Sequence, residues 1–226
     1  MKTIIIAITL ILLFAVLATQ RHALACEAVE FSNYEEVASN IFAPASIENV
    51  GQVLADISAG GQRVNSTFGK MISMPKIILV SNEEQARSFG ANSTARAHLT
   101  PLGVCIVLGP KGQNVDVAAH ELTHSEVSHR VGWFRHWREI PVWFNEGVAL
   151  MVDHRKPFLV KNIKLTEDEI ESVKNLDTGS KYFGGPDTHK NYLASRLAVN
   201  NIEPSTLYKK LELIRNGQSF ADVFKL

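Results

Sequence analysis

The residues His120-Glu121-Leu122-Thr123-His124 constrain this chain more than any other stretch. Residues four positions apart lie on one face of a helix, so a helix allows His120 and His124 to bind the same metal ion. Glu121 then points to the side of the pair, where its carboxylate can hold and deprotonate a metal-bound water. The stretch therefore predicts a helix that carries a two-histidine metal site.

A second apolar segment, residues 141–153, supplies a third ligand. Its only ionisable side chains are Glu146 and Asp153. A carboxylate in such a setting is unfavourable unless it is paired or bound to a metal. We therefore expect Glu146 to complete a His2Glu zinc site that leaves a fourth position open for water. Asp153 follows two helical turns later and can accept the free ring N–H of a ligand histidine.

A metzincin-type site is the competing arrangement of metal ligands. It would require a third histidine six residues after His124, but that position holds Arg130. His129 precedes it by one residue and lies about 100° away around a helix, which places it poorly for the same ion. The spacing favours Glu146 as the third ligand.

HELTH followed by WFNEGVALMVD resembles the gluzincin branch of zinc metallopeptidases, and within it the small bacterial peptidase MA-like domain. The resemblance spans roughly residues 70–226 and implies a zinc-dependent peptidase that acts on a peptide or protein. Outside the ligand segments it rests on two apolar strands, a tyrosine-containing helix and a Gly-Gln-x-Phe tail: residues 77–80, 103–108, 192–195 and 217–220. The Gly-x-Met-Glu-Asn segment of true aminopeptidases is missing, which argues against exopeptidase action.

The same resemblance suggests a second donor to the oxyanion of the substrate, because gluzincin-like enzymes often keep a tyrosine or histidine after the ligand glutamate. Tyr192 is our candidate, with Tyr182 and His189 as alternatives, and Tyr192 as an ordinary core residue is an equal possibility. The rival function is a catalytically silent zinc-binding or scaffolding module of an exported protein. The presence of Glu121 argues against it, because a structural zinc needs no base.

The first 25 residues have the composition of an export signal. Lys2 precedes an uncharged apolar run over residues 4–18, and Ala23-Leu24-Ala25 offers a cleavage pattern before Cys26. We expect a secreted or periplasmic protein. A retained membrane anchor and a lipid on Cys26 are the alternatives, although the run falls short of the ~20 residues that span a bilayer.

Charge and cysteine content exclude little. The chain has 23 basic and 23 acidic side chains, and this balance gives no reason to expect nucleic acid or an anionic membrane surface as a partner. Cys26 and Cys105 could pair in an oxidising compartment. Because Cys105 lies in an apolar strand, a buried small apolar residue is the alternative, and the sequence leaves the pairing open.

The order of elements predicts an α+β fold. We expect a helical lead-in over residues 26–74 and a metallopeptidase domain over 75–226, in which a small sheet packs on the two ligand helices and a helical lobe follows. A peptide could then add along a strand edge in the cleft between sheet and lobe. We expect two strands, at 76–81 and 103–108, and a loop at 91–100. An aromatic loop at 131–138 should pack inward. The expected helices are one over 47–68 that breaks at Gly60-Gly61 and C-terminal helices from Thr166, Thr188 and Pro204.

Overall fold

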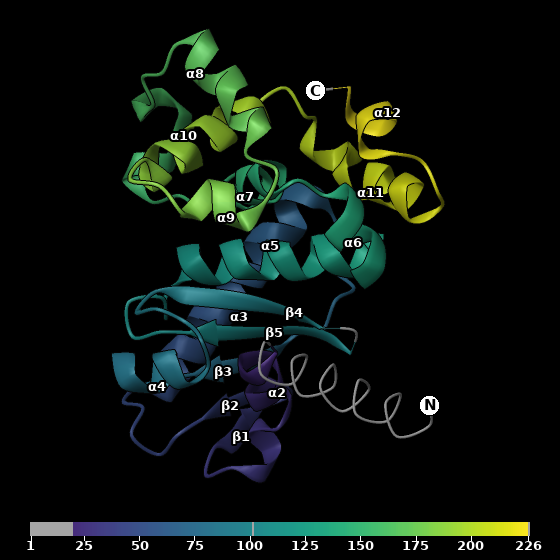
Figure 1. Cartoon of the computed structure of the whole chain (residues 1–226). Helices are drawn as coiled ribbons and strands as arrows, with labels where there is room; N and C mark the ends of the chain where they lie inside the picture. The colour runs from purple at the N-terminus through teal and green to yellow at the C-terminus, as the bar shows by residue number, and fades with distance from the viewer. Residues whose placement is uncertain (1–19, 101, 226) are drawn as a thin grey trace, which may run out of the picture.

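The computed structural model describes residues 20–100 and 102–225 and confirms the α+β fold. A five-stranded mixed sheet lies below the long helix α5 (Val115–Val131), and the later helices form a lobe above it (Figure 1). The strands run in the order β1-β2-β3-β5-β4, with β2, β3 and β5 parallel and the outer pairs antiparallel. Their bounds are Glu35–Ala38, Ile41–Ala43, Lys76–Leu79, Ala95–Thr100 and Gly103–Leu108 for β1 to β5.

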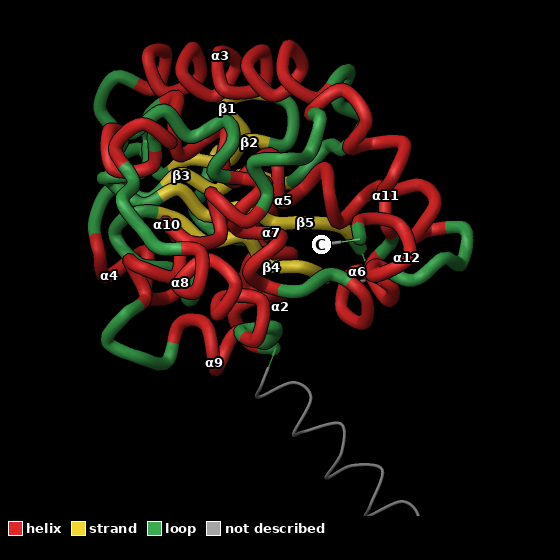
Figure 2. The backbone as a smooth tube through the Cα atoms, turned by 90° about the horizontal axis from the view of Figure 1, so that it is seen from above, coloured by secondary structure: helices red, strands yellow, loops and turns green. Residues whose placement is uncertain are grey.

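The central strands β3 and β5 are buried on both faces, which explains their uninterrupted apolar sequences. Alternate residues belong to two separate cores. Ile77 and Ile106 pack in the core that contains α3 (Val50–Phe68) and α5, whereas Ile78 and Val107 pack in the core that contains α2 (Arg21–Glu27). The strands therefore lie between α3 and α2, as the view from above shows (Figure 2).

Helix α3 corrects the expectation of a break at Gly60-Gly61, because it is continuous from Val50 to Phe68. A Cβ at Gly60 would lie 2.9 Å from the backbone nitrogen of Ala119 in α5. The glycine therefore allows two helices to cross at close range instead of ending one of them. This contact fixes α5 against the sheet side of the molecule.

Two segments expected to be non-strand contribute strands. The lead-in over residues 26–74 contains the β1–β2 hairpin, which turns at Asn40 with a positive φ of 59°. The loop expected at 91–100 contains β4, whose alternating Ala95, Ala97 and Leu99 side chains pack on the main core. That period of two is a strand signal, and the polar turn residues just before it concealed it.

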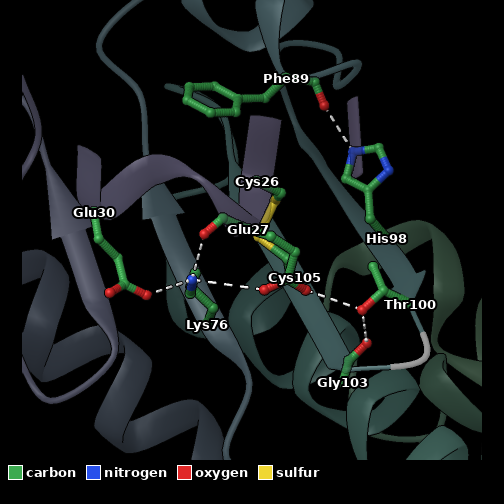
Figure 3. The surroundings of a disulfide bond; sticks show 9 residues. All are labelled: Cys26, Glu27, Glu30, Lys76, Phe89, His98, Thr100, Gly103 and Cys105. Carbon is green, nitrogen blue, oxygen red and sulfur yellow. Dashed lines mark hydrogen bonds and ion pairs between the residues drawn. A yellow bond between two sulfur atoms is a disulfide. The ribbon is translucent and has the colours of Figure 1, made fainter. Parts of the chain in front are cut away.

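A disulfide joins Cys26 of α2 to Cys105 of β5, 79 residues apart, and decides between the two alternatives that the sequence left open for Cys105 (Figure 3). Both side chains are fully buried. Lys76 closes the same junction, since its ammonium donates to the carbonyl of Glu27 and to the carboxylate of Glu30 at 2.9 and 2.8 Å. The segment that precedes the sheet is thus covalently and electrostatically fixed to its face.

Only the last part of the expected export signal, from residue 20 on, lies among the described residues. The apolar run over residues 4–18 lies outside the described residues. The expected cleavage point before Cys26 falls inside α2, where Ala23 and Cys26 are buried. A lipid on Cys26 would need the sulfur that the disulfide uses, so the two states exclude each other. Within residues 20–100 and 102–225, no helix combines the length and apolarity needed to cross a bilayer.

The remaining helices follow their local signals. Asn82 caps α4 through the N–H of Gln85, and Thr166 with Glu169 forms a capping box at the start of α8, the helix expected from Thr166. The aromatic segment expected as a loop is helix α6. The bounds are Glu83–Ser88 for α4, Trp133–Glu139 for α6, Val142–Ala149 for α7, Glu167–Ser172 for α8, Gly179–Phe183 for α9, Thr188–Ala198 for α10, Leu207–Arg215 for α11 and Phe220–Phe224 for α12.

Candidate metal centre

Helix α5 is built to hold the histidine pair in a buried position. Its first turn is capped by Asn114, whose side chain accepts the N–H of Val117 at 3.1 Å. Asp116 lies in that first turn and binds Arg63 of α3, so it is a first-turn carboxylate and not the cap. The helix ends at Gly132, where φ is 84°.

His120, His124 and Glu146 meet between α5 and α7. The Nε2 atoms of the two histidines are 3.1 Å apart, and the Oε2 atom of Glu146 lies 3.3 Å from one and 3.6 Å from the other. One ligand atom from each residue lies within 4.8 Å of the others, and all three residues are buried. Two imidazole nitrogens and one carboxylate oxygen that converge in this way could hold a metal ion.

The same three residues also form ion pairs with one another. Burial raises the pKa of Glu146, but the charges and hydrogen bonds of the two histidines lower it to about 2. Burial lowers the pKa of His124, and Glu146 raises it to about 9. Glu146 is therefore ionised near neutral pH, which is the form that a metal needs. A cation shared by these residues would take the place of the imidazolium proton.

Glu121 lies on α5 beside the histidine pair and is also buried. The pKa of its carboxyl is raised, first by burial and then by the charge on Glu146, while the two histidines oppose the shift. A raised carboxyl pKa moves toward the range that suits a general base working near neutral pH.

Asp153 reaches His120 from beyond the end of α7, since that helix ends at Ala149 and does not continue two turns as expected. Its Oδ2 atom is 3.7 Å from Nδ1 of His120, slightly longer than a hydrogen bond. Arg155 holds the same carboxylate, with Nε at 2.9 Å from Oδ1 and 3.0 Å from Oδ2. The sequence analysis missed Arg155, because a guanidinium two residues from an aspartate is not by itself a signal.

We expect Asp153→Asn to weaken metal affinity by about 10- to 100-fold without removing the site, because an amide orients the His120 ring less strongly than a carboxylate. A competitive chelator titration measures the change. Asp187→Asn, on the exposed start of α10, is the matched control and should leave the affinity unaltered. Equal affinities for Asp153→Asn and the parent protein would assign Asp153 to packing alone.

Asn145 is a second residue whose role the sequence did not reveal. It lies near His124 and His136 and favours the charged form of each ring, although burial dominates at His136 and lowers the pKa of that residue. The Oδ1 atom of Asn145 and the Nδ1 atom of His124 are both buried without a well-formed hydrogen bond among the described residues. Asn145 is therefore placed to accept the ring N–H of His124, as Asp153 is for His120. His136 is buried with its pKa lowered to about 4, so it is neutral.

Of the three oxyanion candidates, Tyr192 fits best. Its pKa is raised by burial and then by the charges on Glu146 and Glu121, so its phenol lies within electrostatic reach of both carboxylates. The hydroxyl of Tyr182 is fully buried and pairs with Ser195 at 2.9 Å. His189 is exposed and packs beside Phe158, with ring centroids 5.9 Å apart.

The metzincin alternative finds no support in the side chains at the end of α5. Arg130 is buried and pairs with Glu126 and Glu212 at 2.6 and 2.8 Å. His129 is exposed and does not belong to the cluster of His120, His124 and Glu146 that forms among the described residues.

A scan against protein-family models, a search of curated proteins and a search of solved structures each found no match. The function is therefore inferred from the residues of the site itself.

Proposed function

We propose that this protein is an exported, zinc-dependent peptidase of the gluzincin type. The observation that carries the proposal is the convergence of His120, His124 and Glu146 beside Glu121 in one buried cluster. A closed structural site would use four protein ligands and would need no base. Three ligands with an adjacent carboxylate suit hydrolysis.

The donor set fits zinc in particular. Catalytic zinc sites commonly combine two imidazoles with one carboxylate and leave a position for water. When bound, zinc would lower the pKa of that water and polarise the substrate carbonyl. Asp153 and Asn145 would orient the two imidazoles from behind.

The side chains of this chain would then carry the protons. Glu121 would accept a proton from the attacking water and pass it to the leaving amine. Tyr192 would donate a hydrogen bond to the carbonyl oxygen of the scissile bond as charge builds on it. The raised pKa of Tyr192 keeps its hydroxyl protonated, as a donor must be.

The substrate would be a peptide in extended conformation. Strand β4 lies at one edge of the sheet and contacts α5, the helix that carries His120 and His124. An extended chain can pair with such an edge. The buried Cys26–Cys105 disulfide supports export, because disulfides persist in oxidising compartments.

Metal analysis and peptide cleavage test the proposal together. We expect one zinc per purified chain and hydrolysis of a mixed peptide library. A chelator should abolish the hydrolysis, and added zinc should restore it. Hydrolysis that survives complete metal removal would refute the mechanism, and bound zinc with no cleavage of any peptide would favour the silent scaffolding module.

A further inference from the structure

The face of the molecule beyond the C-terminal end of α5 exposes an unusual share of the large apolar side chains. The described residues expose eleven such side chains, and six of them lie on this face. Met74 and Leu102 are each 83% exposed and Trp137 is 77% exposed, so they protrude into solvent and do not line the protein core. The aromatic patch, as we name this set, consists of Ile72, Met74, Leu102, Trp133, Phe134 and Trp137.

Three separate segments of the chain form the aromatic patch. A hollow of about 410 Å³ is lined jointly by Ile72, Met74, Leu102 and Trp133. On α6 the rings of Phe134 and Trp137 are 6.4 Å apart. The β4–β5 turn and α6 lie on the same side of the molecule, at the right in Figure 1. This corrects the expectation that the aromatic segment at 131–138 packs inward. Of its four ring side chains only His136 is buried, and the other three are exposed.

A buried charge network fixes the loop that carries Ile72 and Met74. The fully buried carboxylate of Glu126 accepts the backbone N–H groups of Ile72 and Ser73 at 3.1 and 2.9 Å. Arg130 binds Glu126 and lies 3.7 Å from the ring of Tyr208. Immobilising a loop whose apolar side chains point to solvent suggests that those side chains meet a partner.

The charge around the aromatic patch is positive, although the chain as a whole is neutral. Arg138 and Arg215 are exposed beside it, and no acidic side chain of the described residues lines the hollow. The one acid of α6, Glu139, is mostly covered and lies 3.5 Å from Arg138. Protruding tryptophans rimmed by arginines match the interface of an anionic bilayer, where aromatic rings sit at the level of the headgroups.

We propose that the aromatic patch docks this protein onto an anionic lipid surface. Side chains that protrude from three segments around the hollow suit a broad surface that can cover all of them at once. The inference is independent of the proposed peptidase activity, because none of the patch residues belongs to the metal centre.

Tryptophan emission of the full chain with vesicles tests the docking. The only tryptophans are Trp133, Trp137 and the buried Trp143, and residues 1–19 contain none, so the signal reports on the patch even if the amino-terminal segment also binds lipid. We expect a blue shift of the emission with vesicles of phosphatidylglycerol and phosphatidylcholine. Added salt should reduce the shift, and vesicles of phosphatidylcholine alone should give a smaller one.

A double variant and a matched control sharpen the test. Met74→Asp with Leu102→Asp keeps both reporters and should reduce partitioning by about tenfold or more, because two apolar side chains no longer leave water. Phe31→Asp changes a side chain that is 88% exposed outside the patch and should bind like the parent chain. No shift with anionic vesicles, or equal losses in both variants, would overturn the proposal. A shift caused by apolar peptides and not by vesicles would do so too, and would assign the patch to substrate.

Discussion

Glu121→Gln is expected to reduce peptide hydrolysis by about 10²- to 10⁴-fold, the usual contribution of a positioned general base, while zinc content stays at the parent level. Glutamine has the shape of glutamate and still forms hydrogen bonds, but it cannot accept a proton at neutral pH. Removing a buried carboxyl whose pKa is raised also leaves no unpaired charge in the cluster, so the fold should persist. Turnover numbers with a cleaved library peptide, measured beside elemental analysis, give both quantities.

Glu167→Gln provides the matched control for that substitution. Glu167 lies exposed in the first turn of α8, in the helical lobe, and does not belong to the cluster of His120, His124 and Glu146. The control variant should hydrolyse peptides at the parent rate. Near-parent turnover in Glu121→Gln would show that another group takes the proton.

The cluster of His120, His124 and Glu146 was predictable because its signal is local. The spacing of His120 and His124 determines their positions on a helix, and a lone Glu146 in an apolar helix is informative by itself. The apolar runs of β3 and β5 are equally local, because strands buried on both faces need no polar alternation. The capping box at the start of α8 depends on two residues only three positions apart, Thr166 and Glu169.

What the sequence concealed depends on distant contacts. The Cys26–Cys105 pair forms only because α2 packs on the face of β5, and two cysteines in a sequence do not state that geometry. The same holds for Gly60, where the approach of α5 decides between a break and a close crossing. The exposure of Trp133 and Trp137 also differs from what their residue type predicts, since large aromatic side chains are usually buried to a high degree.

Glu146→Gln is expected to lower zinc affinity by more than the about 10- to 100-fold that outer partners contribute, because a neutral amide oxygen replaces an ionised ligand. Competitive chelator titration measures the affinity, and unfolding with and without zinc provides a second readout. At free zinc of about 100 times the parent Kd, binding should stabilise the parent chain by about 2.7 kcal/mol. If the variant binds a hundredfold more weakly, the same zinc concentration stabilises it by only about 0.4 kcal/mol.

The substitutions Glu121→Gln and Glu146→Gln together distinguish three possible roles of the cluster of His120, His124 and Glu146. A peptidase predicts that Glu121→Gln retains zinc and loses turnover, whereas Glu146→Gln loses both. A silent zinc module predicts the same metal affinities with no turnover in any chain. A metal-free ion-pair cluster predicts that zinc stabilises none of them, and that Glu146→Gln destabilises the fold by leaving His124 without its carboxylate partner. Undiminished zinc binding in Glu146→Gln would remove Glu146 from the ligand set and, with it, the three-ligand geometry on which the proposed mechanism depends.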